Sequence, residues 1–91
     1  MKDKLLKIIN HYGYRNQLRK LNEECYELIE AIIDYMDDGS RLCTKKDIEE
    51  EFADVMVILT QIKYYYELDS ERIKEIMEQK VDRQLDRMSK E

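Results

Sequence analysis

The chain has 91 residues, of which 41% are charged and 43% are hydrophobic, and its net charge is −5. With two glycines and no proline, the composition favours a single domain of amphipathic helices and argues against disorder. The negative charge disfavours nucleic-acid binding as a main role, because phosphate contacts need basic patches.

The sequence also disfavours membrane partners and secretion. No apolar run approaches the roughly 20 residues that a membrane-spanning helix needs, and Lys2, Lys4 and Lys7 interrupt any apolar signal sequence at the start of the chain. Cys25 and Cys43 suggest neither a disulfide framework nor a zinc site. We therefore expect a cytoplasmic protein with reduced thiols.

Two helices are predicted in the first part of the chain. The first spans about residues 2–11, and Gly13 is expected to stop it. The second spans about residues 14–37, and the polar residues 37–40 are expected to end it. Apolar residues recur at helical spacing in both helices: Leu5, Leu6, Ile8 and Ile9 in the first, and Leu18, Leu21, Cys25, Leu28, Ile32 and Tyr35 in the second.

Two further helices are predicted in the second part. Thr44 is placed to cap the third helix, with Asp47 in a capping-box position, and this helix should end near Leu68. Asp69 caps a fourth helix that runs to about Ser89. Their apolar faces are Ile48, Phe52, Val55, Leu59, Ile62 and Tyr66, widened by Ile58 and Tyr65, in the third helix, and Ile73, Met77, Val81 and Met88 in the fourth.

We therefore expect an all-α protomer of four helices in one domain, residues 1–91. Its long second and third helices should form an antiparallel core hairpin. A domain this small buries too little surface to be very stable alone. We expect it to complete its helix bundle by oligomerisation.

One acidic pattern occurs in both central helices. Residues 23–28 read E-E-x-x-E-L, and residues 50–55 read E-E-x-x-D-V. Each pattern opens a run of apolar residues, and the second follows the first in phase after 27 residues. Because residues three apart share a helix face, each helix carries a pair of neighbouring carboxylates.

The two carboxylate pairs have matching positions relative to their apolar faces. At roughly 100° per residue, Glu24 lies about 40° and Glu27 about 100° from a face centred on Leu28. Glu51 and Asp54 take the same angles on the third helix. The two helices thus set equivalent carboxylate pairs at the edges of their buried faces.

A solvated acidic face is the alternative interpretation, and it suits the outward-pointing glutamates Glu23, Glu30, Glu49 and Glu50. It does not suit Glu24 and Glu51, which lie within the apolar arcs, where an unpaired carboxylate is costly. Four such groups brought together repel one another unless a cation joins them. Oxygen ligands indicate a hard cation, Mg²⁺ or Mn²⁺, which binds through a few carboxylates together with substrate phosphates.

A basic edge follows on the fourth helix, formed by Lys80, Arg83 and Arg87. One interpretation is a solvated stripe paired with neighbouring acids such as Asp82 or Asp86. The other is a clamp for phosphate groups facing the metal, since a guanidinium grips an oxyanion through two hydrogen bonds. Both interpretations stay open at this point.

The pattern E-E-x-x-E, a 23-residue gap and E-x-x-D resemble the signature of the all-α nucleoside triphosphate pyrophosphohydrolases, the MazG-like proteins, over about residues 12–87. The resemblance implies cleavage between the α and β phosphates and assembly as dimers or dimers of dimers. Larger members carry N-x-K-x-x-R on the following helix; Lys80 and Arg83 fit it, and Glu78 replaces the asparagine. The implied Mg²⁺ ligands are Glu24, Glu27, Glu51 and Asp54.

The favoured hypothesis is a Mg²⁺-dependent enzyme that hydrolyses nucleoside triphosphates as house-cleaning of non-standard or excess nucleotides. Lys80 and Arg83 would hold the outer phosphates. Glu27 and Glu51 are candidate general bases if the metal does not fully engage them. The alternatives are a non-enzymatic, metal-responsive helical interaction module and, within the enzyme class, a phosphoribosyl-ATP pyrophosphatase. The preferred base and sugar stay open.

Overall fold

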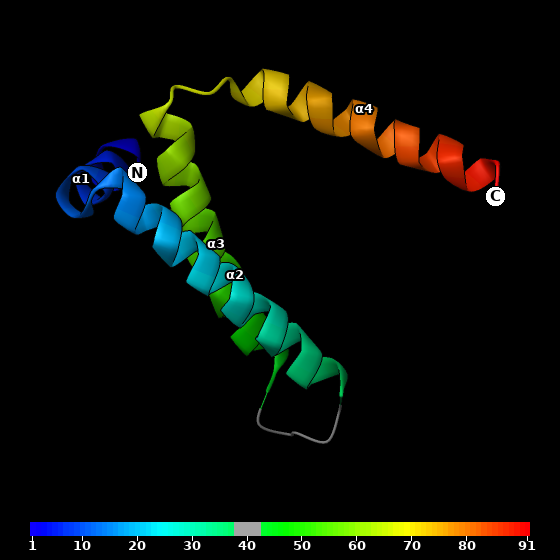
Figure 1. Cartoon of the computed structure of the whole chain (residues 1–91), viewed down its shortest axis with the longest axis horizontal. Helices are drawn as coiled ribbons and strands as arrows, with labels where there is room; N and C mark the ends of the chain where they lie inside the picture. The colour runs from blue at the N-terminus through cyan, green and yellow to red at the C-terminus, as the bar shows by residue number, and fades with distance from the viewer. Residues whose placement is uncertain (38–42) are drawn as a thin grey trace.

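The computed structural model describes residues 1–37 and 43–91. They form four α-helices: α1 (Lys2–Tyr12), α2 (Tyr14–Met36), α3 (Lys45–Tyr65) and α4 (Ser70–Ser89). Helices α2 and α3 lie antiparallel as a hairpin, and α1 packs across one end of it (Figure 1). The all-α, four-helix protomer is confirmed. The polar turn expected over residues 38–40 lies outside the described residues.

The predicted helix termini are largely confirmed. Gly13 separates α1 from α2 and has a φ of +92°, a conformation that a residue with a side chain rarely adopts. The capping box forms at the start of α3, where Asp47 Oδ2 accepts a 2.7 Å hydrogen bond from the Thr44 backbone N–H. Asp69 Oδ1 accepts hydrogen bonds from two backbone N–H groups in the first turn of α4.

The end of α3 differs from the prediction, because the helix stops at Tyr65 rather than near Leu68. The Leu68 N–H donates to the Lys63 carbonyl at 2.9 Å, and the Glu67 N–H donates to the Tyr64 carbonyl at 3.2 Å. These two bonds form a Schellman motif, which usually carries glycine where this chain has Glu67 at a φ of 54°. Because no glycine stands at this position, hydrophobic periodicity alone did not indicate where the helix ends.

The buried apolar core is small. Leu5 and Ile9 from α1 pack with Val55 and Ile58 from α3, and these four are the buried apolar side chains among the described residues. The Cα radius of gyration is 16.6 Å, whereas a compact chain of this length has about 12 Å. A single copy therefore leaves much of its apolar surface in water.

The buried faces of α2 and α3 are rotated relative to the prediction. On α2 the buried residues are Gln17 and Glu24, whereas Leu18 and Ile32 of the expected face are exposed. On α3 the face is centred closer to Ile58 than expected. The expected α2 face was wrong in this respect, because hydrophobicity alone does not reveal which side meets the partner helix. The rotation carries the acidic pairs toward the helix interface.

Aromatic side chains join α2 and α3 at the end of the hairpin next to α1. Tyr14 at the start of α2 stacks on Tyr65 at the end of α3, with ring centroids 5.3 Å apart. Its ring also meets Tyr66 edge to face. These contacts hold the ends of α2 and α3 together near α1.

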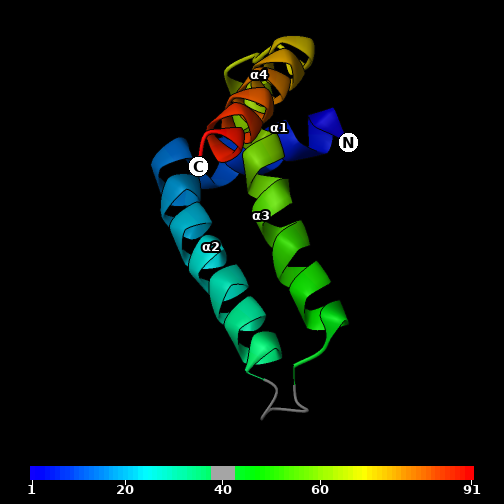
Figure 2. The same cartoon turned by 90° about the vertical axis from the view of Figure 1, so that its right-hand side faces the viewer.

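Helix α4 projects away from the rest of the chain. It packs against none of α1, α2 and α3, and none of its residues is buried; Figure 1 shows α4 extending away from the hairpin. Figure 2 shows α2 and α3 side by side, with α4 overlapping α1 in this view. Its apolar side chains, including Met77, Val81 and Met88, are exposed. The predicted apolar face of this helix is thus unpartnered within one chain. None of the described helices is long and apolar enough to span a membrane.

Candidate metal centre

The two acidic pairs meet across the α2–α3 hairpin. One carboxylate oxygen each from Glu24, Glu51 and Asp54 lies within 4.8 Å of the other two. Glu24 is buried, Glu51 is half-buried and Asp54 is exposed. We call these three residues the carboxylate set. It extends from the buried helix interface to the exposed surface.

Core packing on α3 positions two members of the carboxylate set. Glu51 precedes the buried Val55 by four residues, and Asp54 precedes the buried Ile58 by four. Residues four apart lie on one helix face, so each carboxylate stands one turn from a core anchor. On α2, Glu24 shares the inward face with Gln17, which is also buried.

Two carboxylate oxygens in this arrangement lack partners. Among the described residues, Glu24 Oε2 and Glu51 Oε2 are the enclosed side-chain atoms with no hydrogen bond. Leaving a buried polar atom unpaired costs about 1–3 kcal/mol, and more for a charged group. A cation held between the two helices would satisfy both oxygens, and hard oxygen donors suit Mg²⁺ or Mn²⁺.

Lys20 is the one cation that an ion pair brings to the carboxylate set within the described residues. Its Nζ lies 3.3 Å from Glu24 Oε1, one turn away on α2. Sequence reasoning missed this lysine, although the four-residue spacing from Glu24 would have revealed it. Because the Lys20 side chain is 56% exposed, the ion pair contributes little to stability and can open at low cost in free energy.

Glu27 stands beside the carboxylate set without belonging to its tightest group. The negative charge of Glu24, followed by partial desolvation and the charge of Glu51, raises the pKa of Glu27 above its ordinary value. All four predicted carboxylates thus interact. The structure brings together Glu24, Glu51 and Asp54 most closely, with Glu27 as an exposed neighbour.

Two hollows flank the four carboxylates. One of about 350 Å³ is lined by Glu24 and Asp54 and extends toward α1. The other, of about 400 Å³, is lined by Glu27 and Glu51. A ligand can therefore reach the acidic groups from either side of the hairpin.

A buried amide pair lies in the first hollow and was also missed from the sequence. Gln17 Nε2 donates a 2.7 Å hydrogen bond to Gln61 Oε1, joining α2 to α3. The available signal was spacing: Gln17 lies seven residues before Glu24, and Gln61 lies seven after Asp54. Each glutamine thus falls on the same face of its helix as a carboxylate.

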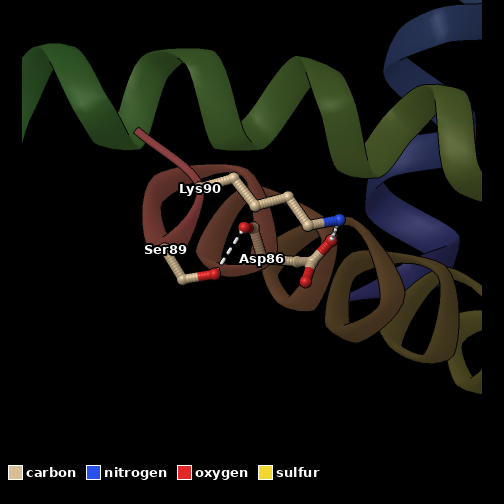
Figure 3. A network of polar contacts seen from close by, with 3 residues as sticks. All are labelled: Asp86, Ser89 and Lys90. Atoms are coloured by element: carbon tan, nitrogen blue, oxygen red, sulfur yellow. Dashed lines mark hydrogen bonds and ion pairs between the residues drawn. The ribbon is translucent and has the colours of Figure 1, made fainter.

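The basic edge on α4 is not brought to the carboxylate set within one chain, because α4 packs against none of the other helices. Among the described residues, Lys80, Arg83 and Arg87 form no ion pair with an acidic neighbour. Asp86 is instead engaged by Lys90 Nζ at 3.0 Å and by the Ser89 hydroxyl, which donates to its carbonyl (Figure 3). The basic groups remain available for an outside anion.

Comparison with known proteins identifies the family of the chain. The family model of the MazG nucleotide pyrophosphohydrolase domain matches residues 13–90. No curated protein and no solved structure matched the chain in the other two comparisons. The matched segment contains both acidic pairs and the basic edge of α4. The chain belongs to the MazG nucleotide pyrophosphohydrolase domain family.

Proposed function

We propose that this protein is a Mg²⁺- or Mn²⁺-dependent nucleoside triphosphate pyrophosphohydrolase. Water attacks the α-phosphorus, and the bond from that phosphorus to the oxygen bridging to the β-phosphorus breaks. Nucleoside monophosphate and pyrophosphate are released. Its role is the removal of non-standard or excess nucleotides.

The observation that carries this proposal is the pair of enclosed, unpartnered oxygens on Glu24 and Glu51. A purely structural acidic face would be solvated or paired, at little cost. Two enclosed, unpartnered carboxylate oxygens on neighbouring helices are costly unless a ligand completes them. Membership of a nucleotide pyrophosphohydrolase family suggests a reaction for these carboxylates, because a cation held by carboxylates can also bind the phosphates of a nucleotide.

The metal ligands in this proposal are Glu24, Glu51 and Asp54, with Glu27 beside them. When bound, the ion supplies Lewis-acid polarisation of a phosphoryl oxygen and neutralises charge on the leaving pyrophosphate. The carboxylates hold their places because core residues on α3 and the hairpin packing fix their helices.

We assign the role of proton acceptor to Glu27. It lies next to the carboxylate set but outside its closest group, so its oxygens are less committed than those of Glu51. It would take the proton of the attacking water as the new phosphorus–oxygen bond forms.

Lys80 and Arg83 would hold the outer phosphates from a second copy of the chain. Their own α4 packs against no other helix of the same chain, while its apolar side chains stay exposed. Docking α4 on a partner would bury that stripe and carry its basic edge toward an acidic site. We propose a homodimer or a dimer of dimers in which this exchange is reciprocal.

The direct experiment measures pyrophosphate and monophosphate release from a panel of NTPs, dNTPs and phosphoribosyl-ATP in the presence of Mg²⁺. The proposal predicts turnover of at least one nucleoside triphosphate. Preference for phosphoribosyl-ATP alone would favour the specialised pyrophosphatase. An interaction module without catalysis predicts no release from any triphosphate.

A further inference from the structure

The hollow beside Glu24 and Asp54 has the composition of a ligand pocket. Its volume of about 350 Å³ is at the lower end of the roughly 300–1,000 Å³ found for small-molecule sites. It therefore suits one end of a nucleotide rather than the whole molecule. Its lining combines the two carboxylates with the amides of Gln17 and Gln61 and with apolar side chains of α1 and α3, including Ile58.

The amides of Gln17 and Gln61 are nearly enclosed, with 5% and 1% of their surfaces exposed. Each uses one polar atom in the bond between them. The other two atoms, Gln17 Oε1 and Gln61 Nε2, form no hydrogen bond with the described residues. Each of these atoms keeps some exposed surface, and both residues line the hollow.

This arrangement presents one hydrogen-bond acceptor and one donor between the apolar side chains and the carboxylates of the pocket. The edge of a nucleobase carries adjacent donors and acceptors, and its ring faces are apolar. A site built on buried polar groups discriminates strongly, because a ligand that fails to pair with them leaves them unsatisfied. The pocket also shares Glu24 and Asp54 with the carboxylate set, where phosphates would lie.

We propose that this hollow binds the nucleoside end of the substrate and that the Gln17–Gln61 pair discriminates between bases by hydrogen bonding to the base edge. This inference rests on the proposed function, which places the phosphates of the substrate at the carboxylate set. It assigns these two glutamines a specificity role that a simple interhelical hydrogen bond does not have.

The first test replaces both amides with a side chain of similar shape, in the double variant Gln17→Met/Gln61→Met. Changing both together avoids leaving one amide unpaired. The ratio of kcat/KM between the best and worst bases should fall about tenfold, the value of one net hydrogen bond. Circular dichroism checks that the variant folds. A ratio within twofold of the parent in a folded variant would overturn the inference.

The second test fills the pocket and does not depend on the amides. Val57 and Leu59 lie on α3 with the same 44% exposure, but Val57 lines the hollow and Leu59 does not. Val57→Trp should weaken binding of nucleoside monophosphates, measured calorimetrically with Mg²⁺, by about tenfold or more. Leu59→Trp should leave it within twofold. Equal effects of the two tryptophans would contradict the assignment.

Monophosphate binding separates this inference from the proposed function, because it needs no turnover. If the parent hydrolyses no triphosphate but Val57→Trp selectively abolishes monophosphate binding, the enzyme proposal fails and the pocket stands. If the parent is active and both tests leave base discrimination and binding unchanged, the pocket fails and the enzyme proposal stands.

Discussion

Glu24 on α2 and Glu51 on α3 each hold one carboxylate oxygen enclosed and unpartnered, and one carboxylate oxygen of each lies within 4.8 Å of the other across the helix interface. Two like charges enclosed this closely destabilise the protein that holds them unless a cation intervenes. The relationship therefore links stability to ligand binding at one place in the fold.

Removing one of these charges should stabilise the metal-free protein. Glu51→Gln relieves both the repulsion and the desolvation of the charge, and we expect a gain of about 1 kcal/mol. This gain corresponds to a rise in Tm of about 4–8 °C for a domain of this size. Glu24→Gln should gain less, because it also loses the ion pair with Lys20.

Thermal melts in excess chelator measure these changes. Glu50→Gln is the matched control, since Glu50 is exposed and adjacent in sequence to Glu51. A Glu51→Gln variant that melts below the parent without metal would show that the oxygens are satisfied in a way the structure does not reveal.

Mg²⁺ or Mn²⁺ should stabilise the parent by binding the folded state. At a concentration one hundred times Kd, one site contributes about 2.7 kcal/mol. Glu51→Gln should lose most of that gain, and Glu50→Gln should keep it. The measurement is the change in Tm on titration with each cation, with and without nucleotide. No shift in the parent even with nucleotide present would remove the metal assignment.

Glu27 predicts a pH dependence for the metal-free protein. Its folded-state pKa is raised, first of all by Glu24, so the folded chain holds this proton at a higher pH than the unfolded chain. Stability should therefore increase as pH falls from the raised pKa toward the ordinary value of 4.5. Glu27→Gln should lack that part of the slope.

Urea unfolding over this pH range in chelator compares the parent with Glu27→Gln and with Glu23→Gln, an exposed neighbour in the same motif. Parallel stability curves for the parent and Glu27→Gln would mean that Glu27 does not feel the neighbouring charges.

If α4 of each copy docks on the partner's site, two impaired variants should complement one another. Glu51→Gln damages the metal site, and Arg83→Ala should lower kcat/KM by about ten- to a hundredfold through loss of a charge-assisted contact. If α4 serves the partner's site, a mixed dimer has one site free of both changes. Equal co-assembly should then restore about a quarter of the parental sites.

Mixing Glu51→Gln with the double variant Glu51→Gln/Arg83→Ala is the control, since no intact metal site can form there. Activity of the first mixture no higher than the average of its components would contradict the exchange. Light scattering that finds a stable monomer at micromolar concentration would contradict the assembly itself.

The sequence predicted local structure better than packing. Thr44, Asp47 and Asp69 act within one turn of their own helix, so their capping roles follow from adjacent residues. The inward turn of Gln17 and Glu24 depends on where α1 and α3 lie, which hydrophobic periodicity does not contain. Hydrophobic periodicity placed Leu18 and Ile32 on the buried face, but both are exposed in the single chain.

In the candidate site, too, the local motif could be predicted and the contacts between helices could not. Its four carboxylates could be predicted because the motif repeats in phase on two helices that form a hairpin. Lys20 and the Gln17–Gln61 bond were missed, because a polar side chain on an apolar face gives no sign of its partner. The position of α4 could not be predicted from one chain, since its apolar stripe has no surface to cover there.

Hydrolysis between the α and β phosphates is tested by identifying, with ³¹P NMR, the products formed in ¹⁸O-labelled water with Mg²⁺. We expect equal amounts of nucleoside monophosphate and pyrophosphate, with the label on the monophosphate. Formation should be lost in Glu51→Gln and retained in Glu50→Gln. Release of diphosphate and inorganic phosphate, or products undiminished in Glu51→Gln, would contradict it.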